Sequence, residues 1–229
     1  MQSGKSEHLA FYSSPIGKKI ITGVTGLGLV AFVLLHMTGN LLLFASADAY
    51  NQYAHFLLSL GPLLYFVELV LLVSFVFHAT LGIQMYFGNR QARPIGYTDY
   101  ATAGWPSLQS MSSRTMILSG LVLLGFLIIH LLSFKYGTYY YTTIDGVEMR
   151  DLARLVVEKF QHPIYTFGYV VVMLLLGFHL RHGIWSGLQS LGAMSPQFTP
   201  VIYGFGLILA VLIAVGFLVL PVAIFFGLV

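Results

Sequence analysis

Residues 67–87 read VELVLLVSFVFHATLGIQMYF, an apolar run that holds a single histidine, His78. Residues 169–188 repeat this design as YVVVMLLLGFHLRHGIWSGL, around His179. The two runs share the string FHxxxGI, in which a glycine follows the first histidine by four residues. About 20 apolar residues cross the hydrocarbon core of a bilayer as a helix, so both runs are predicted to be transmembrane helices. An imidazole is costly in lipid unless a partner engages it, which makes both histidines candidate functional residues.

The composition assigns the whole chain to the membrane class. Its 229 residues are 57% hydrophobic and 8% charged, with a mean hydropathy of +0.83, whereas soluble domains carry about 25% charged residues. For such a chain the net charge of +3 does not indicate a nucleic-acid partner, and none is expected. The absence of cysteine excludes an iron–sulfur cluster, a disulfide and a covalently attached haem within the sequence.

Five apolar runs are long enough to span a bilayer. The predicted helices cover about residues 19–44, 62–87, 116–134, 163–188 and 201–228. Prolines stand at three expected helix starts and inside the last helix: Pro62, Pro163, Pro200 and Pro221. The polar residues 1–17 lack an apolar core followed by a cleavage site, and we expect a retained tail there. The expected fold class is therefore all-α integral membrane, with one transmembrane domain over residues 18–229.

Basic residues set the expected orientation, because Lys and Arg are enriched in cytoplasmic loops. The loop between the first and second helices has no basic residue. Basic residues occur instead in the tail, at the start of the first helix and around the loop between the second and third helices: Lys5, Lys18, Lys19, Arg90, Arg93 and Arg114. The N-terminus is thus expected in the cytoplasm and the C-terminus outside. In the outer loop, 135–162, residues Val147–Phe160 alternate charged and aliphatic residues at helical spacing. They predict a short amphipathic helix, either on the membrane surface or as an ordinary solvated loop helix.

Each of the first four predicted helices carries one deep histidine, and these fall on two levels. Two lie 16 or 17 residues beyond a basic residue on an outward-running helix, about 25 Å from it: His36 after Lys19, and His130 after Arg114. Two lie 12 or 13 residues before the inner end of an inward-running helix, about 18–20 Å from it: His78 before Arg90, and His179 before Gly192. The spacing therefore pairs His78 with His179 at the inner level and His36 with His130 at the outer level.

Two histidines from different helices can fill both axial positions of a haem iron. An iron filled in this way has no open site for oxygen or substrate and is suited to carrying single electrons. We therefore expect two non-covalent b-type haems, the inner iron bound by His78 and His179 and the outer iron by the other pair. The alternative from another class is a haem-free transporter or proton channel that uses the histidines as relays.

Further candidates lie near the inner pair. Gly82 and Gly183 follow a histidine by four residues on one helical face, where a side chain would press on a porphyrin; close helix packing explains them equally well. His182, three residues after His179, is an alternative ligand or a partner for a propionate or quinone. Propionates need cations near the membrane surface, and each candidate cation has the alternative role of anchoring a helix end. These cations are Arg114, Lys18, Lys19 and the deeper Arg181.

Glu68 is the only acid well inside a predicted span. It precedes His78 by ten residues, which places it about 15 Å nearer the outer face, beside the outer pair. A carboxylate at that depth is a candidate for accepting the proton of a quinol or for hydrogen bonding to a quinone head group. A structural hydrogen bond to a neighbouring helix is the alternative.

With these residues identified, the chain resembles the cytochrome b subunit of succinate:quinone oxidoreductase (respiratory complex II), of the single-subunit, five-helix, two-haem type. The resemblance covers most of the chain and keeps the family order. The matching strings are Ser14–Lys19, Thr25–Leu27, Leu35–Asn40, Glu68 with His78 and Gly82, Ser113-Arg114 with Ser119-Gly120 and His130, and Phe178–Ser186. In the family the ligand on the fourth helix is the histidine four residues before the glycine, which favours His179 over His182. The chain departs from the family in its rather long outer loop.

The resemblance implies four helices bundled around two b-type haems, with the fifth helix peripheral, in the inner membrane of a prokaryotic cell. It implies a succinate-oxidising flavoprotein and an iron–sulfur protein as cytoplasmic partners, and a quinone, commonly menaquinone, as the membrane substrate. Electrons would pass from the iron–sulfur protein to the inner haem, then to the outer haem or the quinone. It also allows a homo-oligomer of the whole complex. Related fumarate reductases run the reaction in reverse, and two-haem cytochromes that serve formate dehydrogenase or hydrogenase are a further alternative.

Overall fold

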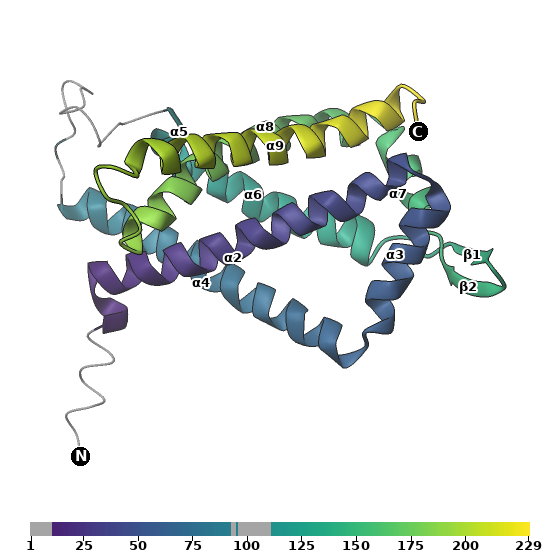
Figure 1. Ribbon diagram of the computed structural model, residues 1–229, viewed down its shortest axis with the longest axis horizontal. Coiled ribbons are helices and arrows are strands. Elements are labelled where there is room, and N and C mark those ends of the chain that lie inside the picture. Colours follow the sequence, from purple (N-terminus) through teal and green to yellow (C-terminus); the bar gives the residue numbers. More distant parts are fainter. Residues whose placement is uncertain (1–10, 93–94, 96–110) are drawn as a thin grey trace, which may run out of the picture.

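The computed structural model describes residues 11–92, 95 and 111–229. Most of the predicted tail and Arg93 lie outside the described residues. The chain folds almost entirely into helices (Figure 1). The elements are α2 (Pro15–Leu41), η1 (Leu42–Phe44), α3 (Ala47–Ser59), α4 (Pro62–Ala92), α5 (Met111–Arg114), α6 (Met116–His130), the π-turn η2 (Leu131–Lys135), β1 (Tyr141–Ile144), β2 (Val147–Arg150), α7 (Leu152–Phe160), α8 (Pro163–Ser190) and α9 (Thr199–Phe225).

In the described part of the chain, five helices are long and apolar enough to cross a membrane. They match the five predicted spans, although the last ends at Phe225, three residues before its predicted end. They are α2 with η1, α4, α6 with η2, α8 and α9. Prolines stand in the first turn of α4, α8 and α9 as expected, where the missing N–H has no intrahelical acceptor. The first helix begins earlier than predicted, because the Ser14 hydroxyl caps it by accepting the Gly17 N–H at 3.0 Å. The second runs to Ala92, five residues past the predicted end.

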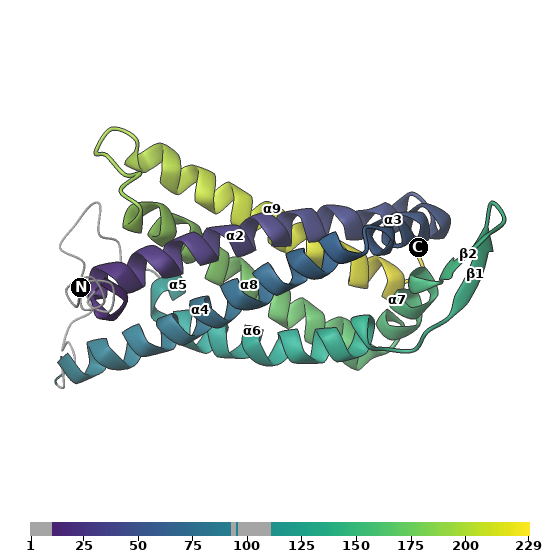
Figure 2. The same cartoon turned by 90° about the horizontal axis from the view of Figure 1, so that it is seen from below.

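The long helices run side by side along one axis, so the bundle has two ends (Figures 1 and 2). One, the N-terminal end, holds the start of α2 and the end of α4; the other, the hairpin end, holds the β-hairpin and the C-terminus. The fifth helix is better packed than a peripheral helix would be: 39% of its apolar window is buried, against 6% for α4 and α6. Small residues explain this, since Gly206 lies against Ile184 of α8 and Gly216 against Met37 of α2.

The two loops at the hairpin end contain regular secondary structure, and only part of it was predicted from the sequence. The predicted helix over Val147–Phe160 begins at Leu152, and Val147–Arg150 instead form a strand paired with β1. Asp145 and Gly146 both have positive φ, which a two-residue hairpin turn requires. The chain is therefore not purely α-helical. The loop between the first two spans contains α3, a helix that was not predicted.

These elements form a cap on the hairpin end with its own small core. Tyr50 of α3 and Ala153, Val156 and Phe160 of α7 pack against Leu220 of α9 and its neighbours. Burial raises the pKa of the Tyr50 hydroxyl, an effect that Arg150 opposes and Tyr53 reinforces. Buried Asn51 joins the two cap helices, because its Nδ2 donates to Asp151 Oδ1 at 2.9 Å and its Oδ1 accepts the Ala153 N–H at 2.9 Å.

Asn51→Ala should loosen the cap, since it leaves the buried Ala153 N–H without its acceptor. A lost buried hydrogen bond of this kind costs about 1–3 kcal/mol. Amide hydrogen exchange of the detergent-solubilised protein should therefore accelerate across α7. Gln52→Ala is the matched control, because Gln52 is exposed and makes a single 3.2 Å bond to Asp145. Equal exchange in the two variants would contradict this role of Asn51.

Candidate functional site

The four deep histidines meet as two pairs of rings inside the bundle. His78 of α4 and His179 of α8 have ring centres 6.2 Å apart, with an angle of 68° between the ring planes. His36 of α2 and His130 of α6 have ring centres 5.7 Å apart, at 88°. The pairing is the one that the helix spacing predicts. Ser119, which touches His179, precedes His130 by 11 residues of the same helix, so the two pairs lie about 16 Å apart along the bundle.

At the pair nearer the N-terminal end, polar groups fix which ring nitrogen is available. His78 Nδ1 lies 3.2 Å from the Thr22 carbonyl oxygen, which can only accept, so Nδ1 carries the proton. His179 Nδ1 lies 3.0 Å from Ser119 Oγ, which is also 2.9 Å from the Thr115 carbonyl oxygen. In both rings Nδ1 thus has a partner outside the pair, and in His78 this leaves Nε2 with its lone pair, the form in which histidine binds a metal.

The pair nearer the hairpin end lies among aromatic rings. His130 Nδ1 is 3.2 Å from the Tyr169 hydroxyl, and its ring stacks on Phe126. His36 stacks on Phe32 and has its Nε2 3.4 Å from Asn40 Nδ2. Asn40 in turn accepts a hydrogen bond from the Tyr50 hydroxyl at 3.0 Å. The cap thus reaches the His36 ring through Tyr50 and Asn40.

The dimensions of both pairs fit one metal ion held between two imidazoles. A metal bonded to one nitrogen of each ring, at about 2 Å per bond, holds the ring centres about 6 Å apart. The observed separations, 5.7 and 6.2 Å, agree with this value. Within the described residues, no group of three or more His, Cys, Asp or Glu side chains could hold a metal ion. Each pair would therefore offer a metal two histidine ligands.

Two glycines lie close to the rings of His78 and His179, whereas the two predicted glycines do not. A Cβ built at Gly82 or Gly183 would meet no atom within 4 Å, so both positions face open space. A Cβ at Gly26 of α2 would lie 2.9 Å from His78 Cε1, and one at Gly120 would lie 3.5 Å from His179 Cε1. These two glycines let the histidines of opposite helices turn inward.

A cavity of about 750 Å³ opens between α4 and α6 toward the N-terminal end. Its walls are mostly apolar and include Ile83, Tyr86, Leu118 and Leu121, with Arg90 at the rim. Leu118 is 60% exposed whereas the adjoining Ser119 is buried, so the cavity lies on the outer side of α6 and not against the histidine rings. Pockets for cofactors have volumes of about 300–1,000 Å³ and walls of this character.

The other residues predicted for the site do not belong to the two ring pairs. His182 packs against Trp185, 6.1 Å between ring centres, and it is His179 that meets His78. Arg181 bonds to Ser112 Oγ and the Tyr203 hydroxyl, away from the histidine pairs. Lys19 lies exposed in the second turn of α2, and Arg114 is the exposed last residue of α5, just before α6. Arg114 lies five residues before Ser119 in the sequence.

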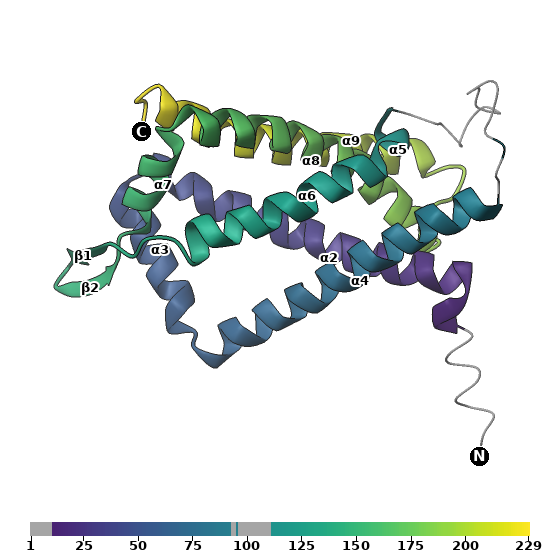
Figure 3. The same ribbon diagram turned by 180° about the vertical axis from the view of Figure 1, so that it is seen from behind.

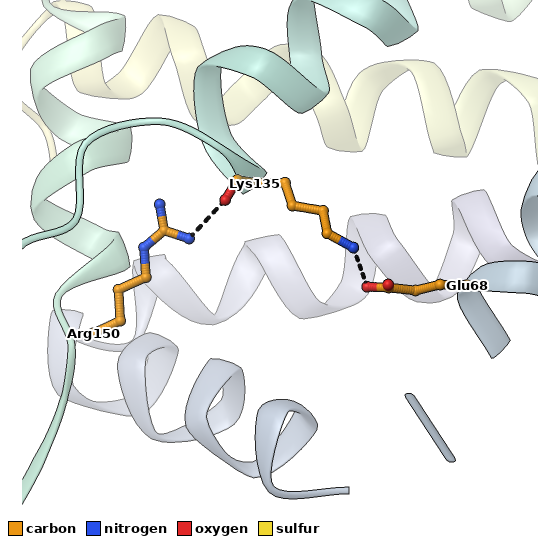
Figure 4. A network of polar contacts seen from close by, with 3 residues as sticks. All are labelled: Glu68, Lys135 and Arg150. Carbon is orange, nitrogen blue, oxygen red and sulfur yellow. Dashed lines mark hydrogen bonds and ion pairs between the residues drawn. The ribbon is translucent and has the colours of Figure 1, made fainter. Parts of the chain in front are cut away.

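Glu68 forms an ion pair with Lys135, a contact that the sequence does not predict (Figure 4). Lys135 ends the π-turn that follows His130, and π-turns often mark functional positions in helices. Arg150 of the cap donates from Nη2 to the Phe134 carbonyl at 2.8 Å and from Nη1 to the Lys135 carbonyl at 3.4 Å. The acid is thus linked to the outer-level pair through the chain segment that carries His130.

No protein-family model matches the chain, and neither does any curated protein or solved structure. The function proposed for the chain therefore depends on its residues and their geometry.

Exchanging the two charges tests the ion pair of Glu68 and Lys135. Each side chain is over one-third exposed, so we expect a coupling of about 0.5–1 kcal/mol. Glu68→Lys and Lys135→Glu should each lower the midpoint of thermal unfolding in detergent by a few degrees, because each places like charges together. The double variant should recover most of the loss. A double variant as unstable as the worse single one would show that the pair does not stabilise the bundle.

Proposed function

We propose that the chain is the two-haem cytochrome b membrane-anchor subunit of a succinate:quinone oxidoreductase, and that it conducts electrons between an iron–sulfur partner and membrane quinone. The observation that carries the proposal is the meeting of four intramembrane histidines as two ring pairs, each spaced for one iron. Iron that is bound by two histidines in a porphyrin supplies a one-electron carrier. Two such sites, stacked about 16 Å apart along the bundle, suit transfer across a bilayer.

The residues have distinct roles in this proposal. His78 and His179 would bind the inner iron through Nε2, with Thr22 and Ser119 holding the opposite nitrogens. His36 and His130 would bind the outer iron, and Tyr169 would orient His130. Orienting groups of this kind typically change metal affinity or activity about 10–100-fold when removed. Arg114, Lys19 and the cavity-rim Arg90 are the cations available for propionates at the cytoplasmic end.

The partners and the quinone follow from the family resemblance. A flavoprotein and an iron–sulfur protein would dock at the N-terminal end, on the cytoplasmic side, and menaquinone is the expected quinone. The main competing function is that of a two-haem cytochrome serving a fumarate reductase, a formate dehydrogenase or a hydrogenase. Co-purification separates the last two from the proposal, since they bring a molybdenum or nickel subunit in place of a succinate- or fumarate-reactive flavoprotein.

Histidine substitutions should remove one haem at a time. His78→Ala or His179→Ala should lose the inner haem, and His36→Ala or His130→Ala the outer one. Pyridine haemochrome titration of each purified variant should then give about half the wild-type haem, because each substitution removes one axial ligand from one of the two irons. His182→Ala is the matched control and should retain both haems. Loss of haem from His182→Ala but not from His179→Ala would reverse the assignment.

Glu68→Gln should slow quinone turnover while retaining both haems. The amide keeps the shape of the side chain but cannot accept a proton at neutral pH, so we expect the turnover rate to fall by about a hundredfold or more. Steady-state assays with a soluble quinone analogue would measure it. Lys135→Gln also breaks the ion pair but keeps the carboxylate, and it should turn over faster than Glu68→Gln. Equal rates in the two variants would reduce Glu68 to a structural role.

A further inference from the structure

Arg181 occupies an unusual position for a cation in a membrane helix. It lies on α8, a span whose apolar window is otherwise typical of lipid-embedded helices, and its side chain is half-buried. Its Nη1 donates to Ser112 Oγ of α5 at 3.1 Å, and its Nη2 donates to the Tyr203 hydroxyl of α9 at 2.9 Å. Among the described residues no carboxylate lies within salt-bridge distance of it. Both contacts are neutral, so within that part of the chain the positive charge is left without a counter-charge.

The surroundings of Arg181 are also rich in donors. Trp185, one helical turn further along α8, packs against the Tyr203 ring at 6.1 Å. Its Nε1 is buried, and no acceptor in the described part of the chain lies within hydrogen-bonding distance. An arginine has five N–H donors, of which the two bonds above engage two. A group that brings negative charge and several acceptors would complete this cluster.

The hydrogen bonds of Arg181 direct its guanidinium toward the N-terminal end of the bundle. Tyr203 is four residues from the first residue of α9, about 6 Å along the helix. It therefore lies near the end of the bundle where α8 contacts both α9 and α5 (Figure 3). Arg181 lies two residues from His179 and so points about 200° away from it around the helix, which separates the cluster from the haem sites.

An apolar stripe on α8 continues directly from Arg181 toward the membrane centre. Val171, Leu174 and Phe178 are 57%, 49% and 47% exposed, and their spacing of three and four residues places them on the same helical face as Arg181. A ligand with an anionic head at Arg181 and a hydrocarbon chain along this stripe matches both features. Membrane phospholipids have this form, and basic pockets between transmembrane helices bind anionic ones.

We propose that Arg181, with Tyr203 and Ser112, forms a binding site for the phosphate of an anionic phospholipid, whose acyl chains lie along Val171, Leu174 and Phe178. A lipid without a cationic head is favoured, because no carboxylate among the described residues pairs with the positive charge of Arg181. The site does not depend on haem or quinone. It would tether α8 and α9, and with them His179, to the leaflet at the N-terminal end.

The test uses the purified complex with all its subunits, washed in neutral detergent and supplied with phosphatidylglycerol or phosphatidylcholine. Native mass spectrometry should show one phosphatidylglycerol retained per chain and little phosphatidylcholine. Arg181→Gln should reduce retention about five-fold, the effect of one interfacial cation. Arg181→Lys keeps the charge and should retain more lipid than Arg181→Gln. Arg90→Gln is the matched control, since Arg90 also bonds a tyrosine hydroxyl at the same end of the bundle.

Several outcomes would overturn the proposal. Equal retention of the two lipids by the wild-type complex would overturn the proposal. This comparison needs no variant, so it remains a test even if Arg181→Gln fails to fold. Equal loss in Arg181→Gln and Arg90→Gln would indicate general surface electrostatics. Displacement of the bound lipid by inorganic phosphate alone, with no phospholipid retained, would indicate a small-anion site. Haem content of the same samples is a separate readout, so failure here leaves the proposed function standing.

Discussion

The structure depends on the cost of placing imidazoles in a lipid-facing bundle. A polar ring in hydrocarbon needs a partner for each nitrogen, and the chain provides the first partner from its own backbone and hydroxyl groups. The Thr22 carbonyl and Ser119 hydroxyl hold the Nδ1 atoms of His78 and His179. The ring centres of these two histidines lie 6.2 Å apart. Four helices are thereby joined in pairs at two heights.

The cap and the fifth helix support this arrangement from outside. Tyr50 in the cap reaches His36 through Asn40, and Arg150 holds the carbonyls of the turn that follows His130. The ion pair between Glu68 and Lys135 joins α4 to the same turn. At the opposite end, α9 closes on α8 through small residues, which positions Tyr203 against Arg181. The hairpin-end histidines are thus connected to extramembrane structure, whereas the inner-level pair is held mostly within the bundle.

The parts that the sequence predicted are those governed by distance along one helix. The five spans and the pairing of levels follow from apolar length and a constant rise per residue, so they need no tertiary information. The contacts that it missed act across helices: Thr22 and Lys135 carry no local signal of their role, and Gly26 and Ser119 entered only as parts of strings typical of a family. The prediction for the loop at 135–162 was wrong in part, because a few residues of alternating charge are compatible with a strand as well as a helix. The Asp145-Gly146 turn favoured a hairpin. Helix α3 was not predicted, because it lacks the long apolar run by which the transmembrane spans were recognised.

Haem content of the purified wild-type complex is the decisive quantity. A reduced-minus-oxidised spectrum together with a pyridine haemochrome assay would count b-type haems per polypeptide. Two haems per chain is the predicted result, because we propose one iron at each ring pair. A colourless complex, or one with a single haem per chain, would be incompatible with two histidine-bound irons at different heights in the bundle.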